Sequence, residues 1–300
     1  MSRSKIAALI VAAVMVVSGV SMLILGLTVG AAPVVSIGNK DTVKKGGSTM
    51  ESGNIDLDDF DSVRIDVSSV DTIIEKGDGY SLEYMAYNDS VPETEVKNGH
   101  LTITQPGRNA FFMFDFRFFG NDQRPYYKLT VPDDCKKLDI NLESSSGDFT
   151  SEGVNISGKL DLSSGDVRIS DSEGKELELK ASSGSTDLEK VALKKLKVHV
   201  SSGSVSVYDS RIDDISADLS SGSTKLEDVE VKNADLESSS GDITLNLLGK
   251  EDDYSFDIDT SSGDIKIGDK KLDDHYETDG NKSGSIKADV SSGDVTIDFK

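Results

Sequence analysis

The stretch DLSSGDVRIS (residues 161–170) is built around the tetrad Ser-Ser-Gly-Asp, which returns along the chain as Ser-Ser-Gly followed by Asp or Ser. Successive tetrad glycines are 18, 19, 19, 19, 19, 22 and 30 residues apart. These glycines are Gly147, Gly165, Gly184, Gly203, Gly222, Gly241, Gly263 and Gly293. A spacing that stays close to nineteen residues is typical of a protein built from stacked, equivalent units.

Apolar residues flank the tetrad at fixed offsets. The positions five and seven before the glycine are apolar apart from Gly158, and those two and four after it are apolar or Thr apart from Ser151. Apolar residues two apart indicate a strand with one buried face. Because the two sets lie at odd and at even offsets, a continuous strand would point them to opposite faces, so the Ser-Ser-Gly must turn the chain.

Short strands joined by a turn in every repeat predict an all-β fold, a parallel β-solenoid of about eight coils over residues 136–300. Apolar pairs such as Val191 with Leu193 suggest a third short side. Residues 55–135 predict an amino-terminal β cap with degenerate coils, in which Val70 occupies a glycine position. No cap is evident beyond the last strand pattern, so we expect the loop 269–284, or charged Asp298 and Lys300, to protect that edge.

The amino-terminal residues predict a membrane anchor. Residues 6–29 contain no charge, and about 36 Å of helix is enough to cross about 30 Å of hydrocarbon. The basic residues before this segment place residues 1–5 in the cytoplasm and the remainder of the chain outside. A signal peptide cleaved near Ala31-Ala32 is the alternative. Residues 30–54 are rich in Gly, Ser and charge and predict a flexible linker.

The composition excludes several function classes. The chain has 32 Lys and Arg against 54 Asp and Glu, a formal net charge of −22, so we expect no nucleic-acid partner. A single cysteine, Cys135, provides no disulfide framework. His100, His199 and His275 are scattered, and no common catalytic motif accompanies the many serines. The sequence therefore predicts neither an enzyme nor a bound cofactor.

The residue after each tetrad glycine is a candidate cation ligand where it is an aspartate. In a solenoid these residues would stack about 4.8 Å apart. Oxygen ligands of this kind suit Ca²⁺, although the spacing matches no calcium-binding loop. The alternative, which we prefer, is that each carboxylate accepts amide hydrogens at the turn and faces water. The aspartates are Asp148, Asp166, Asp242, Asp264 and Asp294.

An aromatic cluster is the candidate partner-binding site. The segment FFMFDFRFFG (residues 111–120) lies inside an apparent insertion, residues 105–126. Alternate aromatic residues would form one face of a strand, either covering the core of the cap or exposed to a partner or the bilayer surface. The alternating residues are Phe112, Phe114, Phe116 and Phe118.

Three segments carry a resemblance to a known family: FDSVRIDVSS (60–69), YYKLTVP (126–132) and LDINLESSSGDF (138–149). With the repeated Ser-Ser-Gly turns, they make residues 55–300 resemble a bacterial family of unknown function that is called the "putative adhesin" domain. The resemblance implies a β-solenoid-like fold behind one membrane segment in a cell-envelope protein. It implies no catalytic residues.

Three hypotheses about function follow. The preferred one is a non-catalytic module of the bacterial cell membrane, anchored through residues 6–29, whose acidic solenoid binds an envelope protein or a surface glycan. The second is an extracytoplasmic part of a regulatory or envelope-sensing membrane complex. The third, a carbohydrate-active enzyme, rests on analogy with polysaccharide lyases that have parallel β-helices.

Overall fold

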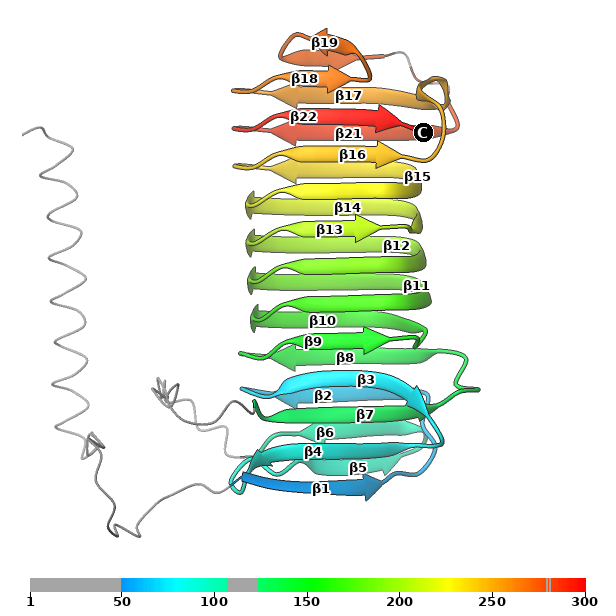
Figure 1. Cartoon of the computed structure of the whole chain (residues 1–300), viewed down its shortest axis with the longest axis vertical. Helices are drawn as coiled ribbons and strands as arrows, with labels where there is room; N and C mark the ends of the chain where they lie inside the picture. The colour runs from blue at the N-terminus through cyan, green and yellow to red at the C-terminus, as the bar shows by residue number, and fades with distance from the viewer. Residues whose placement is uncertain (1–49, 107–123, 279, 281) are drawn as a thin grey trace, which may run out of the picture. The chain divides into compact units, whose positions relative to one another are not determined.

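The computed structural model describes residues 50–106, 124–278, 280 and 282–300. In this part of the chain every element is a strand except one 3-10 helix, η1 (Glu251–Asp253), and the strands join in a single sheet (Figure 1). The prediction of an all-β fold is confirmed. The predicted membrane segment, residues 6–29, lies outside the described residues, and none of the described helices is long and apolar enough to cross a membrane.

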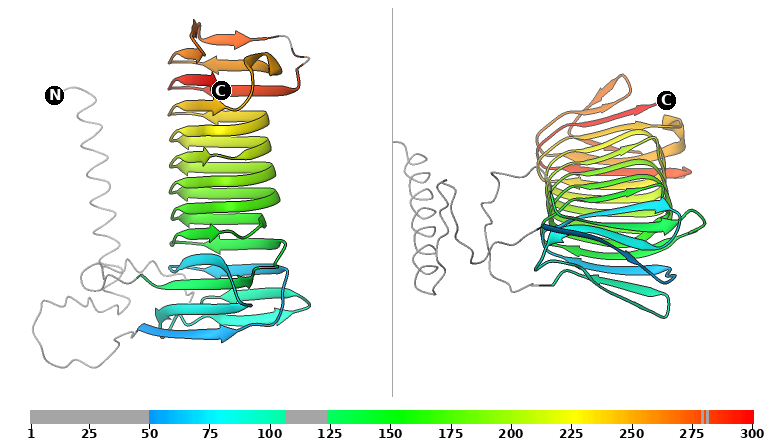
Figure 2. Two further views of the ribbon diagram at one scale, coloured as in Figure 1. Left: turned by 45° about the vertical axis from the view of Figure 1, so that its right-hand side comes forward. Right: turned by 60° about the horizontal axis from the view of Figure 1, so that its bottom comes forward.

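Strands of the middle of the chain stack in sequence order (Figures 1 and 2). They are β8 (Leu138–Ser144), β9 (Phe149–Glu152), β10 (Ile156–Ser164), β11 (Val167–Ser183), β12 (Thr186–Ser202), β13 (Val205–Tyr208), β14 (Arg211–Ser221), β15 (Thr224–Ser238) and β16 (Ile243–Leu247). One face of the stack consists of β8, β10, the second half of β11, the second half of β12, β14 and the second half of β15. The opposite face consists of β9, the first halves of β11 and β12, β13, the first half of β15 and β16. All these pairings are parallel, as predicted.

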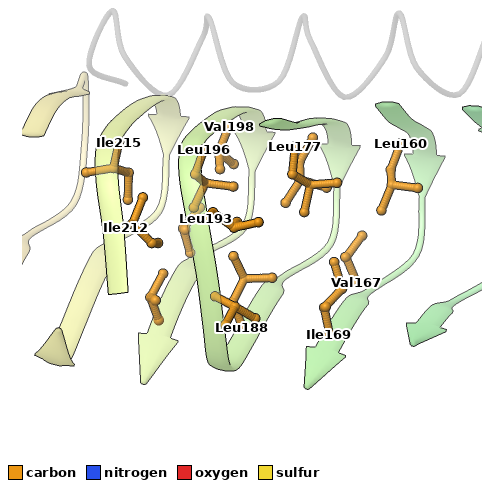
Figure 3. Close-up of a cluster of buried hydrophobic side chains, with 14 of the residues drawn as sticks. Leu160, Val167, Ile169, Leu177, Leu188, Leu193, Leu196, Val198, Ile212 and Ile215 are labelled. Atoms are coloured by element: carbon orange, nitrogen blue, oxygen red, sulfur yellow. The ribbon is translucent and has the colours of Figure 1, made fainter. Parts of the chain in front are cut away.

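The core lies between the two faces. Leu177 of β11 is in register with Gly158 of β10 and Leu196 of β12, so equivalent residues of successive coils form columns. The apolar positions that flank each tetrad are all buried. Figure 3 shows leucines of one face and residues such as Ile169 of the other pointing into the space between the strands. Gly158 interrupts its column because a Cβ there would lie 2.0 Å from the carbonyl oxygen of Ile140.

A third short side connects the two faces away from the Ser-Ser-Gly corners. Val191, Leu193, Val229 and Val231 are buried there, as their apolar pattern predicted. The strands β11, β12 and β15 run continuously through this side, from one face to the other. A nineteen-residue coil therefore has three sides.

The carboxyl-terminal coils do not follow the order of the sequence. They contain β17 (Tyr254–Thr260), β18 (Ile265–Ile267), β19 (Lys270–Leu272), β20 (His275–Glu277), β21 (Gly284–Val290) and β22 (Val295–Phe299). β21 pairs in parallel with both β15 and β17, and β22 pairs with both β16 and β18. The chain thus leaves one coil position open after β16, builds the β17–β18 coil beyond it, and returns to fill the position (Figure 1).

This order corrects the predicted end of the solenoid. The last strand of the sequence is interior to the stack and needs no cap, because it has a parallel neighbour on each side. The outer edge belongs to β17 and β18. There the predicted covering loop does fold across the edge, since β19 pairs antiparallel with β18 and β20 pairs antiparallel with β17. The regular solenoid predicted for residues 136–300 is therefore interrupted by this short cap.

The amino-terminal end shows the same displacement. Its strands are β1 (Met50–Asp56), β2 (Ser62–Val67), β3 (Asp71–Gly77), β4 (Ser81–Tyr87), β5 (Glu93–Lys97), β6 (His100–Thr104) and β7 (Tyr126–Pro132). The β2–β3 coil pairs in parallel with β8–β9 on one side and with β6–β7 on the other. Val70 takes the corner position as predicted, because its carbonyl oxygen lies 2.2 Å from where a Cβ of Gly147 would be.

Antiparallel strands complete this end, and one of them corrects a predicted boundary. β4 pairs with β7, β5 with β6, and β1 with β4. β1 begins at Met50, so the flexible linker predicted for residues 30–54 extends too far. The physical reason is that the free edge of β4 offers backbone partners along all seven residues of β1.

Candidate binding surface

The predicted corner glycines form one continuous column. Seven of the eight have φ between 125° and 147°, a region that favours glycine. A Cβ at any of the eight would lie within 2.3 Å of a backbone carbonyl oxygen of the neighbouring coil. At Gly203 that oxygen belongs to Gly184 and the distance would be 2.0 Å. The glycines are therefore structural, since they let consecutive coils approach at the corner.

The residues after the glycines form a hydrogen-bonded ladder. The amide N–H of Asp166 donates to Oδ1 of Asp148 at 2.9 Å, and the amide of Ser185 donates to Oδ1 of Asp166 at 2.9 Å. Five further pairs have the same bond, at 2.8–3.4 Å, from the amide of the first residue to a side-chain oxygen of the second. They are Asp148 to Asp71, Ser223 to Ser204, Asp242 to Ser223, Asp294 to Asp242 and Asp264 to Asp294. Seven of these side chains thus accept the amide of the next coil, and the four aspartates among them that follow a tetrad glycine agree with the interpretation preferred from the sequence. The ladder is interrupted between Ser185 and Ser204, which no described hydrogen bond of this kind joins.

Basic side chains compensate part of the charge of this ladder. Arg168 Nη2 lies 2.8 Å from Asp166 Oδ2, and Arg168 Nη1 lies 3.9 Å from Asp148 Oδ2. Asp264 is the outermost member, and its Oδ2 lies 2.7 Å from Nζ of Lys271 in the cap. The ladder therefore ends on an ion pair instead of a further coil.

The five candidate cation ligands stack in one column, but they do not converge on a common point. Within residues 50–106, 124–278, 280 and 282–300, no three His, Cys, Asp or Glu side chains are grouped so that they could hold a metal ion. One oxygen of each of Asp148, Asp166, Asp242 and Asp294 is already used by an amide. A calcium site in this column stays a hypothesis for titration.

Among the ladder carboxylates, Asp71 has a shifted pKa. Burial raises the pKa of Asp71, the amide of Asp148 lowers it by donating a hydrogen bond, and the charge of Asp148 raises it further. The net shift is upward from 3.8. Removing the charge at this position while keeping the acceptor is therefore expected to be favourable.

The second corner was not found from the sequence. Asp171, Lys190, Asp209 and Asp228 have φ of 51°, 51°, 48° and 57°, and Gly153 has 70°. All five lie six residues after a tetrad glycine. The sequence did contain a signal for this corner, because four of these five residues are aspartate or glycine. Both residue types adopt positive φ more readily than most. Side chains at this corner point away from the core and line a groove of about 850 Å³ with Leu248.

The structure brings one serine and one histidine together. Oγ of Ser62 lies 3.0 Å from Nδ1 of His100, across the β2–β6 pair. Among the described residues no carboxylate forms an ion pair with His100, so the pair lacks the third group of a catalytic triad. His275 lies 2.7 Å from Asp259 at the far end of the stack, and that contact raises the pKa of His275. His199 lies 3.7 Å from Asp218 on the face that contains β14, so the three histidines are not part of one site.

The aromatic candidates Phe112, Phe114, Phe116 and Phe118 lie outside the described residues. The ends of the predicted insertion, residues 105–126, belong to the fold. Gln105 is buried, and its Oε1 accepts the amides of Ser68 and Ser69 at 2.6 and 3.2 Å. Tyr126 begins β7. The insertion is therefore shorter than predicted at both ends.

A family model described as Toastrack DUF4097 matches residues 60–298, nearly all of the stack just described. The chain belongs to the Toastrack family. The resemblance to an adhesin-like domain of unknown function, noted from three sequence segments, is thereby confirmed. The Toastrack fold is β-solenoid-like, which agrees with the stacked parallel strands seen here. None of the curated proteins matches this Toastrack chain.

Solved structures with a similar arrangement include a "putative adhesin" from Parabacteroides merdae, at 14% identity and a TM-score of 0.49, covering 84% of this chain and 97% of that one. A "putative lipid binding protein" from Parabacteroides distasonis has 21% identity, a TM-score of 0.46 and coverage of 85% and 98%. A "putative cell adhesion protein" from Clostridium sporogenes has 17% identity, a TM-score of 0.30 and coverage of 85% and 100%. The family match, and not these structures, establishes the relationship.

Proposed function

We propose that this Toastrack chain is a non-catalytic, adhesin-like binding module of the bacterial cell surface or envelope, anchored through residues 6–29. The observation that carries the proposal is the register of the stack, which keeps equivalent outward side chains of neighbouring coils side by side. Repeat proteins of this kind bind partners along extended faces. Inward positions form the core, glycines and aspartates hold the corners, and the outward strand positions remain for a partner.

Crosslinking on intact cells tests this function. The native cysteine, Cys135, is buried, so in a Cys135→Ser background a single new cysteine can carry a photo-crosslinker. Asp218→Cys would place it on the face that contains β14, where the Asp218 side chain is 60% exposed. Lys266→Cys would place it on the opposite face, in β18. We expect one of the two variants to capture a partner that the unlabelled protein does not.

The captured material separates the remaining hypotheses. Surface glycan or an envelope protein supports the binding module. Membrane proteins of the same cell, lost on changing Phe112 and Phe116 to Ser, would instead favour the regulatory complex. Capture by neither labelled variant would contradict binding of a partner along the two flat faces.

A further inference from the structure

A second groove, on the third side, differs in charge from the remainder of the molecule. Its volume is about 450 Å³, and it follows β11, β12 and β14 beside the turn before β8. The register places Glu173 beside Ala192 and Gly174 beside Leu193, so Lys175 and Lys194 are neighbours on adjacent coils. The coil spacing brings their backbones about 4.8 Å apart.

The groove is basic although the chain is acidic. Its lining contains five basic residues and two acidic ones, Glu173 and Asp213, a local balance of +3 in a chain of net charge −22. The basic residues are Lys136, Lys137, Lys175, Lys194 and Arg211. A hydrogen bond from Lys232, together with the charges of Lys232, Arg211 and Lys194, lowers the pKa of Asp213. We call this surface the basic groove.

Three cations of the basic groove have no internal counter-ion. Among the described residues, no carboxylate lies within 4.0 Å of Lys136, Lys175 or Lys194, and all three are exposed. Asp213, one of the two acidic residues of the lining, is paired with Lys232, whose Nζ lies 2.9 Å from its Oδ1. Several lysines of the flat faces are paired, as Lys159 is with Asp161 at 3.0 Å, although Lys195 and Lys266 form no ion pair with a described residue. The basic groove therefore groups three unpaired cations in a chain that has an excess of carboxylates.

Small residues keep the basic groove open between its lysines. Gly174 and Ala192 lie in the lining, and the side chain of Leu193 below them is buried. A Cβ at Gly174 would lie 2.2 Å from the carbonyl oxygen of Ile156, so the coil packing itself keeps a side chain out of this position. The result is a shallow channel along the stack with unpaired ammonium groups beside it.

We propose that the basic groove binds a linear anionic glycan, a sugar polymer with a carboxylate or phosphate on successive residues. A polymer with regularly repeated charges matches cations on successive coils, such as Lys175 and Lys194, and it can follow the stack axis in an extended form. The inference rests on the proposed function, because it names the class of partner that the module binds. The acidic faces would repel an anionic polymer, but salt screens this repulsion over about 8 Å at physiological ionic strength.

Two other anionic partners fit less well. An anionic membrane surface is usually bound with apolar side chains inserted beside the basic ones. The large apolar side chain exposed in the described part of the chain, Leu248, lines the other groove. Single-stranded nucleic acid is bound with aromatic stacking platforms, and none of the residues that line the basic groove is aromatic.

The test measures binding of the full-length protein in detergent to polygalacturonate, with dextran as the neutral polymer. The variant Lys136→Gln/Lys175→Gln/Lys194→Gln removes three positive charges from the groove. The matched control Lys159→Gln/Lys180→Gln/Lys225→Gln removes three from the flat faces, where each lysine has a carboxylate partner. We expect the groove variant to bind about tenfold more weakly and the control to bind as the unmodified protein does, with the affinity falling as salt is raised.

Each outcome decides the matter, provided that the thermal midpoints of both variants match the unmodified protein. Selective loss in the groove variant supports the inference, with polygalacturonate or with poly(glycerol phosphate) as the probe. Equal loss in both variants, no binding of either anionic polymer, or a groove effect seen only with phosphatidylglycerol vesicles or single-stranded DNA overturns it. Crosslinking from Asp218→Cys or Lys266→Cys does not involve the groove. Captured partners without glycan binding would therefore leave the proposed function standing.

Discussion

The carboxylate of Asp242 accepts the amide N–H of Asp294 at 2.9 Å, although the two residues are 52 positions apart. Asp264, which comes between them in the sequence, lies one coil further out and donates its own amide to Asp294 at 2.8 Å. The ladder therefore follows the stack and not the chain. Its order differs from that of the sequence because β21 and β22 return to the coil position between β15–β16 and β17–β18.

The ladder itself is the first feature to test, at Asp242. Asp242→Ala removes the acceptor of the Asp294 amide, and we expect it to lower the free energy of unfolding by about 0.5–1.5 kcal/mol. Asp242→Asn keeps an oxygen acceptor and should cost clearly less. Urea unfolding measures both variants, and equal losses would show that the charge, not the hydrogen bond, matters there.

At the corner, Gly203→Ala is expected to destabilise the fold by more than about 3 kcal/mol or to prevent folding, because it adds both an unfavourable φ and a backbone collision. Gly79→Ala is the control, since nothing lies within 4 Å of its Cβ position and its φ lies outside the left-handed range that favours glycine. Thermal unfolding compares the two variants. A Gly203→Ala protein as stable as the Gly79→Ala protein would refute the steric role of the column.

Asp71→Asn should change the pH dependence of stability. Folding raises the pKa of Asp71 above 3.8, so the folded protein binds this proton more tightly than the unfolded chain does. The free energy of unfolding therefore falls as the pH rises from 3.8 through the pKa of the folded state. The variant has no such loss and its Oδ1 can still accept the Asp148 amide. We expect it to be more stable than the unmodified protein near neutral pH and about equal below 3.8. An advantage that is the same at every pH would contradict this assignment.

Deleting residues 284–300 should disconnect the outer coil. Without β21 and β22, the strands β15 and β16 on one side and β17 and β18 on the other lose the parallel strands that lie between them. We expect amides of β17 and β18 to lose their protection from hydrogen exchange, while those of β11 and β12 keep it. Unchanged protection at the start of β17, outside its pairing with β20 at residues 257–259, would mean that β17 can pair with β15 directly.

Calcium is expected to have little effect. Oxygens of the aspartate column already accept amides or contact cations, so millimolar Ca²⁺ should leave the thermal midpoint of the full-length protein unchanged. A ligand that binds the folded state alone must raise that midpoint. A rise with Ca²⁺ that disappears in Asp166→Asn would instead establish a site in the column.

The repeat predicted the architecture because each coil reproduces the same pattern of buried and turning residues. It could not predict the order of the end coils. Phe256 with Ile258 and Ile286 with Ala288 present the same inward pattern, and nothing local distinguishes the coil that pairs with β15 from the one beyond it. The start of β1 was missed for a related reason, because its residues are mostly polar and pair with an edge instead of a core.

The binding surface was less predictable than the corners. The aspartates share one offset from the glycine, so their column was evident, and their partner amides followed from turn chemistry. The basic groove combines Lys136, which precedes the repeats, with Lys175 and Lys194 of the third side. Their proximity depends on how the third side packs, which the two-residue alternation of the strands does not reveal.

The interior position of the last coil has a mechanical consequence. A pull on Lys300 is transmitted to β22, which is held along five registered residues by β16 and along three by β18. An outermost coil could be peeled off one row of backbone hydrogen bonds at a time, whereas this coil has to be drawn out from between two rows that are loaded together in shear. Tension at the carboxyl terminus therefore meets the resistance of the middle of a stack, not of its edge.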